Sequence, residues 1–152
     1  MKQKIYILLT ILCMVGIFSF SARSGEVSSQ DSYNVGMLVG HLAVPGFDGW
    51  GEEQQTAFAQ KIDHPVRKTA HATEYAILAF FVFGAVGKTS VKKRFFTSQA
   101  ICTLYAVTDE VHQLFVPGRD GNPTDVLIDS AGAFVMLALL CLVAVKIIKS
   151  RR

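Results

Sequence analysis

Residues 5–22 read IYILLTILCMVGIFSFSA, an uncharged run of eighteen residues that follows MKQK at residues 1–4 and ends at Arg23. As an α-helix this run would rise about 27 Å, close to the thickness of the hydrocarbon core of a bilayer. A cleavable signal peptide is the alternative, because Ser19-Phe20-Ser21 offers a small-x-small cleavage site, but the apolar run is long for such a signal. The stretch therefore predicts a retained membrane-spanning helix.

Three further segments have the length of a membrane span, although ionisable residues interrupt them. We predict spans at about residues 69–87, 95–116 and 126–145. A hydropathy scan could miss the second or the third span because of their charges. The 152 residues suit one compact domain. The predicted fold is an all-α membrane protein, a four-transmembrane-helix bundle over residues 1–152.

The basic residues support this count of spans. With a cytoplasmic N-terminus, the cytoplasmic pieces are residues 1–4, 88–94 and 146–152. They hold ten of the fifteen basic residues and none of the twelve acidic residues. Cytoplasmic loops of membrane proteins carry such an excess of lysine and arginine. The pattern predicts a multi-pass protein of the bacterial cytoplasmic (inner) membrane with both termini in the cytoplasm.

The outer segment between the first two spans, residues 23–68, is too long for a simple loop. Val35, Leu38, Val39 and Leu42 recur at the spacing of an amphipathic helix, which Pro45-Gly46 would end. A second short helix is predicted over residues 52–62, and His64-Pro65 would start the helix of the second span. These short amphipathic helices would lie on the outer membrane face or cap the bundle. A mobile linker is the alternative.

Ionisable residues gather near the outer ends of the last three spans. His71, Glu74 and Tyr75 share one face of the second span, with Lys68 one turn earlier. Asp109, His112 and Gln113 share a face of the third span. Asp125 and Asp129 share a face of the fourth span with Gly132, which would let another helix approach closely. Since all three faces lie at one depth, we expect them to line one pocket that opens to the outside.

Arg119 lies in the Pro- and Gly-rich loop between the third and fourth spans, and we expect this loop to close the pocket. The candidates for moving protons are His71, Glu74, Asp109, Glu110 and His112. The candidates for binding a ligand are Arg67, Lys68, Tyr75, Gln113, Arg119, Asp125 and Asp129. Among them Arg67, Lys68 and Arg119 would hold a phosphate.

Three interpretations of this cluster remain open. The polar groups could join the helices through hydrogen bonds that are individually weak, about 0.6 kcal/mol each. They could bind or modify an anionic, lipid-linked ligand. They could hold a metal ion, because histidines and carboxylates project inward in bundle metal sites, although ordinary helix faces share the same spacing.

Several better-marked classes of site gain no support from the sequence. The three cysteines lie inside apolar segments, which argues against disulfides and zinc knuckles. No nucleophile elbow, phosphate-binding glycine loop or CxxC motif is present. An ion-coupled carrier is disfavoured because no internal inverted repeat is visible and no acid lies in the cytoplasmic half of any predicted span. The sequence gives no basis for naming a cofactor, and no nucleic-acid partner is expected.

Four motifs carry a resemblance to a known family. They are Phe18-Ser19-Phe20-Ser21, Arg67-Lys68-x-x-His71-x-x-Glu74-Tyr75-x-x-Leu78, Thr108-Asp109-Glu110-x-His112-Gln113-x-Phe115-Val116-Pro117-Gly118-Arg119 and Asp125-Val126-x-x-Asp129-x-x-Gly132. With these motifs the chain resembles the VanZ-like family of small membrane proteins, from about Ile5 to Leu140. Members of that family often carry Asn where this chain has Asp129, which speaks against a role that needs a neutral amide there.

The family's named member lowers susceptibility to teicoplanin, a lipoglycopeptide antibiotic. The resemblance therefore implies a protein of the cell envelope that contacts the lipid bilayer. Its ligand would be a lipid-linked envelope precursor or a lipoglycopeptide, bound or modified in the outward-facing pocket. The alternative is a non-catalytic structural or assembly partner in the membrane.

Overall fold

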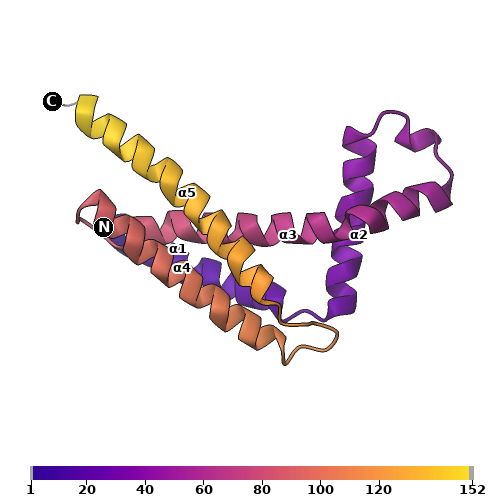
Figure 1. The fold of residues 1–152 in the computed structure, drawn as a ribbon, viewed down its shortest axis with the longest axis horizontal. Helices are drawn as coiled ribbons and strands as arrows, with labels where there is room; N and C mark the ends of the chain where they lie inside the picture. Colours follow the sequence, from indigo (N-terminus) through magenta and orange to yellow (C-terminus); the bar gives the residue numbers. More distant parts are fainter. Residues whose placement is uncertain (1, 151–152) are drawn as a thin grey trace.

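The computed structural model describes residues 2–150, which form helices and no strands (Figure 1). The elements are α1 (Lys2–Ser21), α2 (Gly25–Ala43), the short 3-10 helix η1 (Phe47–Gly49), α3 (Glu52–Ala85), α4 (Val91–Gln113) and α5 (Pro123–Ser150). The predicted all-α class is confirmed.

Helix α3 is the centre of the fold and packs against each of the other four α-helices. Its C-terminal half contributes Tyr75, Leu78 and Val82 to the core, where α4 adds Cys102 and α5 adds Leu137. With 34 residues, α3 is about 51 Å long, more than one bilayer core needs. Its N-terminal half therefore extends beyond the bundle, where α2 crosses it (Figure 1).

Gly132 decides how closely α5 approaches α3. A Cβ at this position would lie 2.1 Å from the carbonyl oxygen of Ala72. The two backbones can meet at this point only because residue 132 has no side chain. The close approach expected from the sequence is thus confirmed, and α3 is identified as the helix that makes it.

The expected break before Pro65 is wrong, because α3 runs without interruption through this residue. Proline removes one backbone donor, and here its ring lies on an exposed side of the helix. The ion pair of Asp63 with Arg67, at 2.5 Å, spans the proline on the neighbouring face. Ser32 of α2 also donates a hydrogen bond to Asp63. On the other side of the proline, Arg67 donates to Ser29 of α2 at 3.3 Å, so contacts from α2 support both sides of this weak point.

Helix α2 confirms the expected amphipathic helix but extends it, since it begins at Gly25. Its buried face is made of small residues, Ser32, Gly36 and Gly40, and Gly36 packs against Ala59 of α3. The larger apolar residues, such as Leu38 and Leu42, are exposed. The small residues therefore let α2 pack closely on α3, and the larger apolar residues of α2 form its outer face.

Two of the described helices are long and apolar enough to cross a membrane: α1, and α5 over Pro123–Ile147. The expected spans at residues 69–87 and 95–116 fall mostly within α3 and α4, which are too polar to qualify by composition. Each expected span runs slightly too far, because α3 ends at Ala85 and α4 at Gln113. Length and hydropathy thus mark two candidate membrane spans among the described helices, whereas the sequence predicted four, so the four-span bundle is not confirmed.

The basic segments meet at one end of the bundle. The start of α1, the turn between α3 and α4, and the end of α5 lie on the same side of the molecule, at the left of Figure 1. The clustered ionisable residues lie at the opposite end, near the loop between α4 and α5. The fold therefore separates a purely basic end from an end that holds both signs of charge.

Candidate functional site

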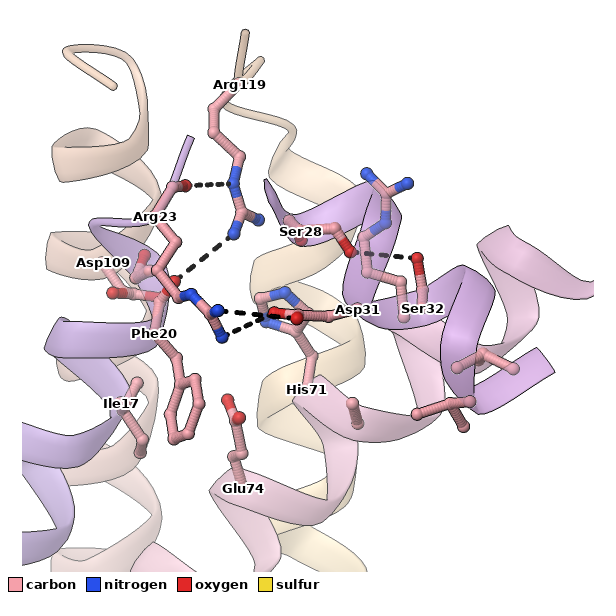
Figure 2. Close-up of a pocket in the computed structure, with 15 residues that line it drawn as sticks. Ile17, Phe20, Arg23, Ser28, Asp31, Ser32, His71, Glu74, Asp109 and Arg119 are labelled. Atoms are coloured by element: carbon pink, nitrogen blue, oxygen red, sulfur yellow. Dashed lines mark hydrogen bonds and ion pairs between the residues drawn. The ribbon is translucent and has the colours of Figure 1, made fainter. Parts of the chain in front are cut away.

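A cavity of about 290 Å³ lies where α1, α2, α3 and α4 meet at the mixed-charge end (Figure 2). Its lining residues are Ile17, Phe20, Ser21, Arg23, Ser28, Asp31, Ser32, Val35, Val66, Arg67, Ala70, His71, Glu74, Asp109 and Arg119. Five of the twelve residues predicted from the sequence are among them: Arg67, His71, Glu74, Asp109 and Arg119. We call this space the polar cavity.

Helix α3 supplies one wall of the polar cavity. Arg67, His71 and Glu74 recur at four and three residues, so they project from one face of the helix. Asp109 comes from α4 and lies away from His71, on another side of the space (Figure 2). The cavity thus brings together a histidine, three carboxylates and three arginines from distant parts of the sequence.

Arg119 reaches into the polar cavity from the loop between α4 and α5. Its Nε donates to the carbonyl oxygen of Arg23 at 3.1 Å, and its Nη2 donates to that of Phe20 at 3.4 Å (Figure 2). The backbone N–H of Gly25 also donates to the carbonyl of Pro117. These bonds fasten the loop to the linker between α1 and α2, and through Arg119 the loop contributes to the lining of the cavity.

The charge of Arg119 has no carboxylate partner within residues 2–150. Burial lowers the pKa of this guanidinium, and the neighbouring Arg67 lowers it further. Arginine nevertheless stays protonated in proteins. The cavity therefore contains a half-buried cation whose hydrogen bonds go only to neutral carbonyl groups.

The other two arginines of the polar cavity have acidic partners. Arg23 forms an ion pair with Asp31 at 2.5 Å, and both side chains are largely exposed. Arg67 pairs with Asp63 and also donates to Ser29 at 3.3 Å. Arg67 Nε is buried and has no partner in the described part of the chain. Both guanidinium groups still have donors free, since each carries five N–H bonds.

Four predicted site residues, Lys68, Tyr75, Asp125 and Asp129, lie outside the polar cavity in the contact between α3 and α5. Lys68 pairs with Asp125, which removes it from the expected phosphate-binding set. His71 Nδ1 faces Asp129 Oδ1 at 3.7 Å, and the Asp129 side chain is fully buried. The hydroxyl of Tyr75 is buried beside them. At Gly132 the backbones of α3 and α5 come close together, and no residue of α5 lines the polar cavity.

The remaining three predicted residues lie near the C-terminal end of α4, outside the polar cavity: Glu110, His112 and Gln113. Gln113 Nε2 donates to Asp109 at 3.3 Å and to Glu110 at 3.2 Å. Glu110 also accepts from the backbone N–H of Asn122 at 2.8 Å, which ties the loop between α4 and α5 to α4. His112 packs against Phe18 of α1, with ring centroids 4.4 Å apart. These three residues support the cavity wall and do not line the cavity.

Many buried polar atoms at this depth have no hydrogen-bond partner among the residues that the structure describes. They include His71 Nδ1, Tyr75 Oη, Asp109 Oδ1, His112 Nε2 and both carboxylate oxygens of Asp129. Such atoms are rare in native proteins, and each one demands an explanation.

The donor sets do not favour a metal ion. No group of three or more histidine, cysteine or acidic side chains converges within the described residues in a way that could hold a metal. Chemically, the cavity offers guanidinium groups that can bind an anion, with His71, Glu74 and Asp109 close by as acids or bases.

Sequence reasoning missed the side chains that α2 and its linker contribute, above all Arg23 and Asp31. A signal was present, because residues 23–32 are polar and directly follow an apolar span. They must therefore lie at the depth where the other charged residues gather. This segment was expected to lie on the outer surface, so Arg23 and Asp31 were not predicted to line the cavity.

A family model described as VanZ/LLP1 matches residues 6–144. The chain belongs to the VanZ/LLP1 family. Neither a curated protein nor a solved structure matches the chain. The resemblance seen in the sequence is confirmed.

The VanZ/LLP1 match extends from α1 into α5 and includes all twelve predicted site residues. It also includes Arg23 and Asp31, so the whole polar cavity lies inside the family domain. The cavity is therefore a feature of the VanZ/LLP1 part of the chain.

Proposed function

We propose that the protein crosses the bacterial cytoplasmic membrane four times, through α1, the C-terminal half of α3, α4 and α5. The apolar exteriors of the two polar helices support this placement. Helix α4 exposes Phe96, Leu104 and Val111 along its length, and α3 exposes Ile77 and Phe80. Exposed apolar surface of this extent marks contact with lipid or with another protein.

The charges set the orientation in this proposal. The basic end holds no acidic residue, so it faces the cytoplasm together with both termini. The polar cavity then faces outward, at the level of the outer leaflet. Helix α2, with its exposed Leu38 and Leu42, lies along the outer membrane surface.

We further propose that the polar cavity binds the anionic group of a lipid-linked or lipidated ligand of the cell envelope. The observation that carries this proposal is Arg119, a half-buried cation without an acidic partner in residues 2–150, held over the cavity by two carbonyl groups. An anion from outside the chain would complete its hydrogen bonding. Arg67 and Arg23 stand beside it, and Ile17, Phe20 and Val35 give the ligand's apolar part a surface.

The test uses teicoplanin as the probe, in bacteria that lack their own copy of the protein. Expression of the unchanged chain should lower susceptibility to teicoplanin, and Arg119→Ala, Glu74→Gln and His71→Ala should each abolish the effect. Losing a charge-assisted hydrogen bond costs about 1.5–3 kcal/mol, which corresponds to a loss of roughly 10- to 100-fold in affinity. The amount of each variant in the membrane fraction is measured in parallel.

The matched control is Lys61→Ala, an exposed cation on α3 that lies outside the polar cavity. It should leave the phenotype unchanged. An unaltered phenotype in all three cavity variants, at normal protein level, would refute the proposed site.

A structural or assembly role is the second candidate. It is favoured by the pairs that the chain makes with itself, Lys68 with Asp125 and Gln113 with Asp109 and Glu110. In that case the same cavity variants would act only by reducing the amount of folded protein. A well-folded but inactive Glu74→Gln variant decides against it.

A further inference from the structure

A second cavity lies at the opposite, basic end of the bundle. It has a volume of about 760 Å³. We call it the basic groove, and it is lined by Lys2, Gln3, Tyr6, Phe80, Phe83, Gly84, Gly87, Lys88, Arg94 and Leu140. Its walls come from α1, α3, α4 and α5 and from the turn between α3 and α4. Nothing in the proposed role of the polar cavity uses it.

The cations of the basic groove are unopposed. Lys2, Lys88 and Arg94 form no ion pair with any residue of the described range. The sequence also contains no acidic residue before Glu26, between Glu74 and Asp109, or after Asp129. Three positive charges therefore line one cavity, and no acidic side chain of residues 2–150 pairs with them.

Arg94 lines the groove and is held in place by Phe83. Its guanidinium lies over the ring of Phe83, 3.8 Å from the centroid. Its Nε and Nη2 donate to the carbonyl oxygen of Phe83 at 3.1 and 2.6 Å. A guanidinium has five N–H donors, so donors remain for a ligand after these bonds are made. Stacking of this kind orients the group before the ligand arrives.

The shape of the groove depends on the glycines that let α1 approach α3. A Cβ at Gly84 would lie 2.3 Å from the Tyr6 ring, and one at Gly87 would lie 2.6 Å from Gln3 Nε2. Gln3 also donates to the carbonyl of Ala85 at 3.0 Å. These contacts hold the start of α1, with Lys2, against the end of α3.

The basic groove is also partly apolar. Phe80 is exposed on the α3 side of the groove, and Leu140 lines the groove from α5. A soluble phosphate would bind the three cations and make no contact with these apolar side chains. A molecule with a phosphate and an attached hydrocarbon chain would contact both the cations and the apolar side chains of the groove.

We propose that the basic groove binds the headgroup of an anionic phospholipid from the inner leaflet. The phosphodiester lies among Lys2, Lys88 and Arg94, and an acyl chain follows Phe80 and Leu140 into the bilayer. Basic pockets between membrane helices on the cytoplasmic side bind anionic headgroups in this way. This inference rests on the proposed membrane placement of the chain, but not on the ligand of the polar cavity.

The experiment titrates the full chain, purified in detergent, with phosphatidylglycerol and with phosphatidylcholine, and counts bound lipids by native mass spectrometry. Phosphatidylglycerol should bind more tightly. Each basic residue near the headgroup is worth about a fivefold change in affinity, so the double variant Lys2→Gln/Lys88→Gln should weaken binding roughly 30-fold. The matched control is Lys92→Gln/Lys93→Gln, which removes the same charge from neighbouring residues outside the groove.

Three outcomes would overturn the proposal. One is equal binding of the two lipids, and another is equal weakening by the two double variants, which would indicate diffuse attraction to the whole basic end. The third is competition by free glycerol 3-phosphate over the same concentrations as the lipid, which would make the ligand a soluble phosphate. If the proposed membrane placement were wrong, the chain would be absent from the membrane fraction, and this result is distinct from the three outcomes above. Teicoplanin susceptibility should not respond to Lys2→Gln/Lys88→Gln.

Discussion

Replacing Gly132 by alanine should lower the free energy of unfolding by about 3 kcal/mol, at the upper end of the cost of overpacking a core. The added Cβ would lie 2.1 Å from the carbonyl oxygen of Ala72, which belongs to the backbone and cannot rotate away. Helices α3 and α5 must separate to make room, and this opens the contact that buries Asp129 and Tyr75. Thermal unfolding of the purified chain in detergent measures the loss.

The matched control is Gly16→Ala on α1. Apart from its chain neighbours and the backbone of its own helix, nothing lies within 4 Å of a Cβ placed at Gly16. The same substitution there should be neutral or stabilising, because alanine favours a helix over glycine by up to about 1 kcal/mol. If both variants unfold at the same temperature, the packing of α5 on α3 does not depend on Gly132.

Removing the Lys68 side chain should cost about 3 kcal/mol of stability. Lys68 and Asp125 form an ion pair between α3 and α5, with side-chain exposures of 18% and 12%. Lys68→Ala leaves the carboxylate of Asp125 in a largely buried place without its partner. Breaking a buried pair from one side costs about 3–5 kcal/mol, and the residual exposure of this pair places it at the lower end. Chemical unfolding of the purified chain measures the change.

Two further variants separate the ion pair from general effects of lost charge. Lys61→Ala removes an exposed lysine from the same helix and should change stability by less than about 0.5 kcal/mol. The double variant Lys68→Met/Asp125→Leu replaces both charges by apolar side chains and should recover most of the lost stability. A loss in Lys68→Ala as small as that in Lys61→Ala would show that Asp125 does not depend on Lys68.

Helix positions and the two charged ends could be predicted from the sequence because they depend on local spacing. The predicted amphipathic helix, the apolar first helix and the basic cytoplasmic pieces all follow from where the charges fall along the chain. The role of Gly132 could also be predicted, since a glycine on a polar helical face implies close packing. The helix break expected at Pro65 does not occur. The rule that proline ends a helix considers only the local chain, whereas contacts from α2 stabilise α3 around this residue.

The candidate site was predicted in part. His71, Glu74 and Asp109 lie in one cavity, as their shared depth implied. Depth alone does not fix the rotation of a helix about its axis, however. Lys68 and Asp129 turn toward α5, while Arg23 and Asp31 enter from a segment that the sequence analysis placed on the surface.

The sequence by itself determined the all-helical class, the family and the separation of charge between the two ends, because each depends on residue type and spacing. The tertiary structure decided which of the clustered ionisable groups meet. The backbone contact at Gly132 sets which face of α3 packs against α5. The carbonyl groups of Phe20 and Arg23 hold Arg119 at the polar cavity, which another face of α3 lines. Contacts between residues so distant in the chain arise only when the helices pack, so no local pattern contains them.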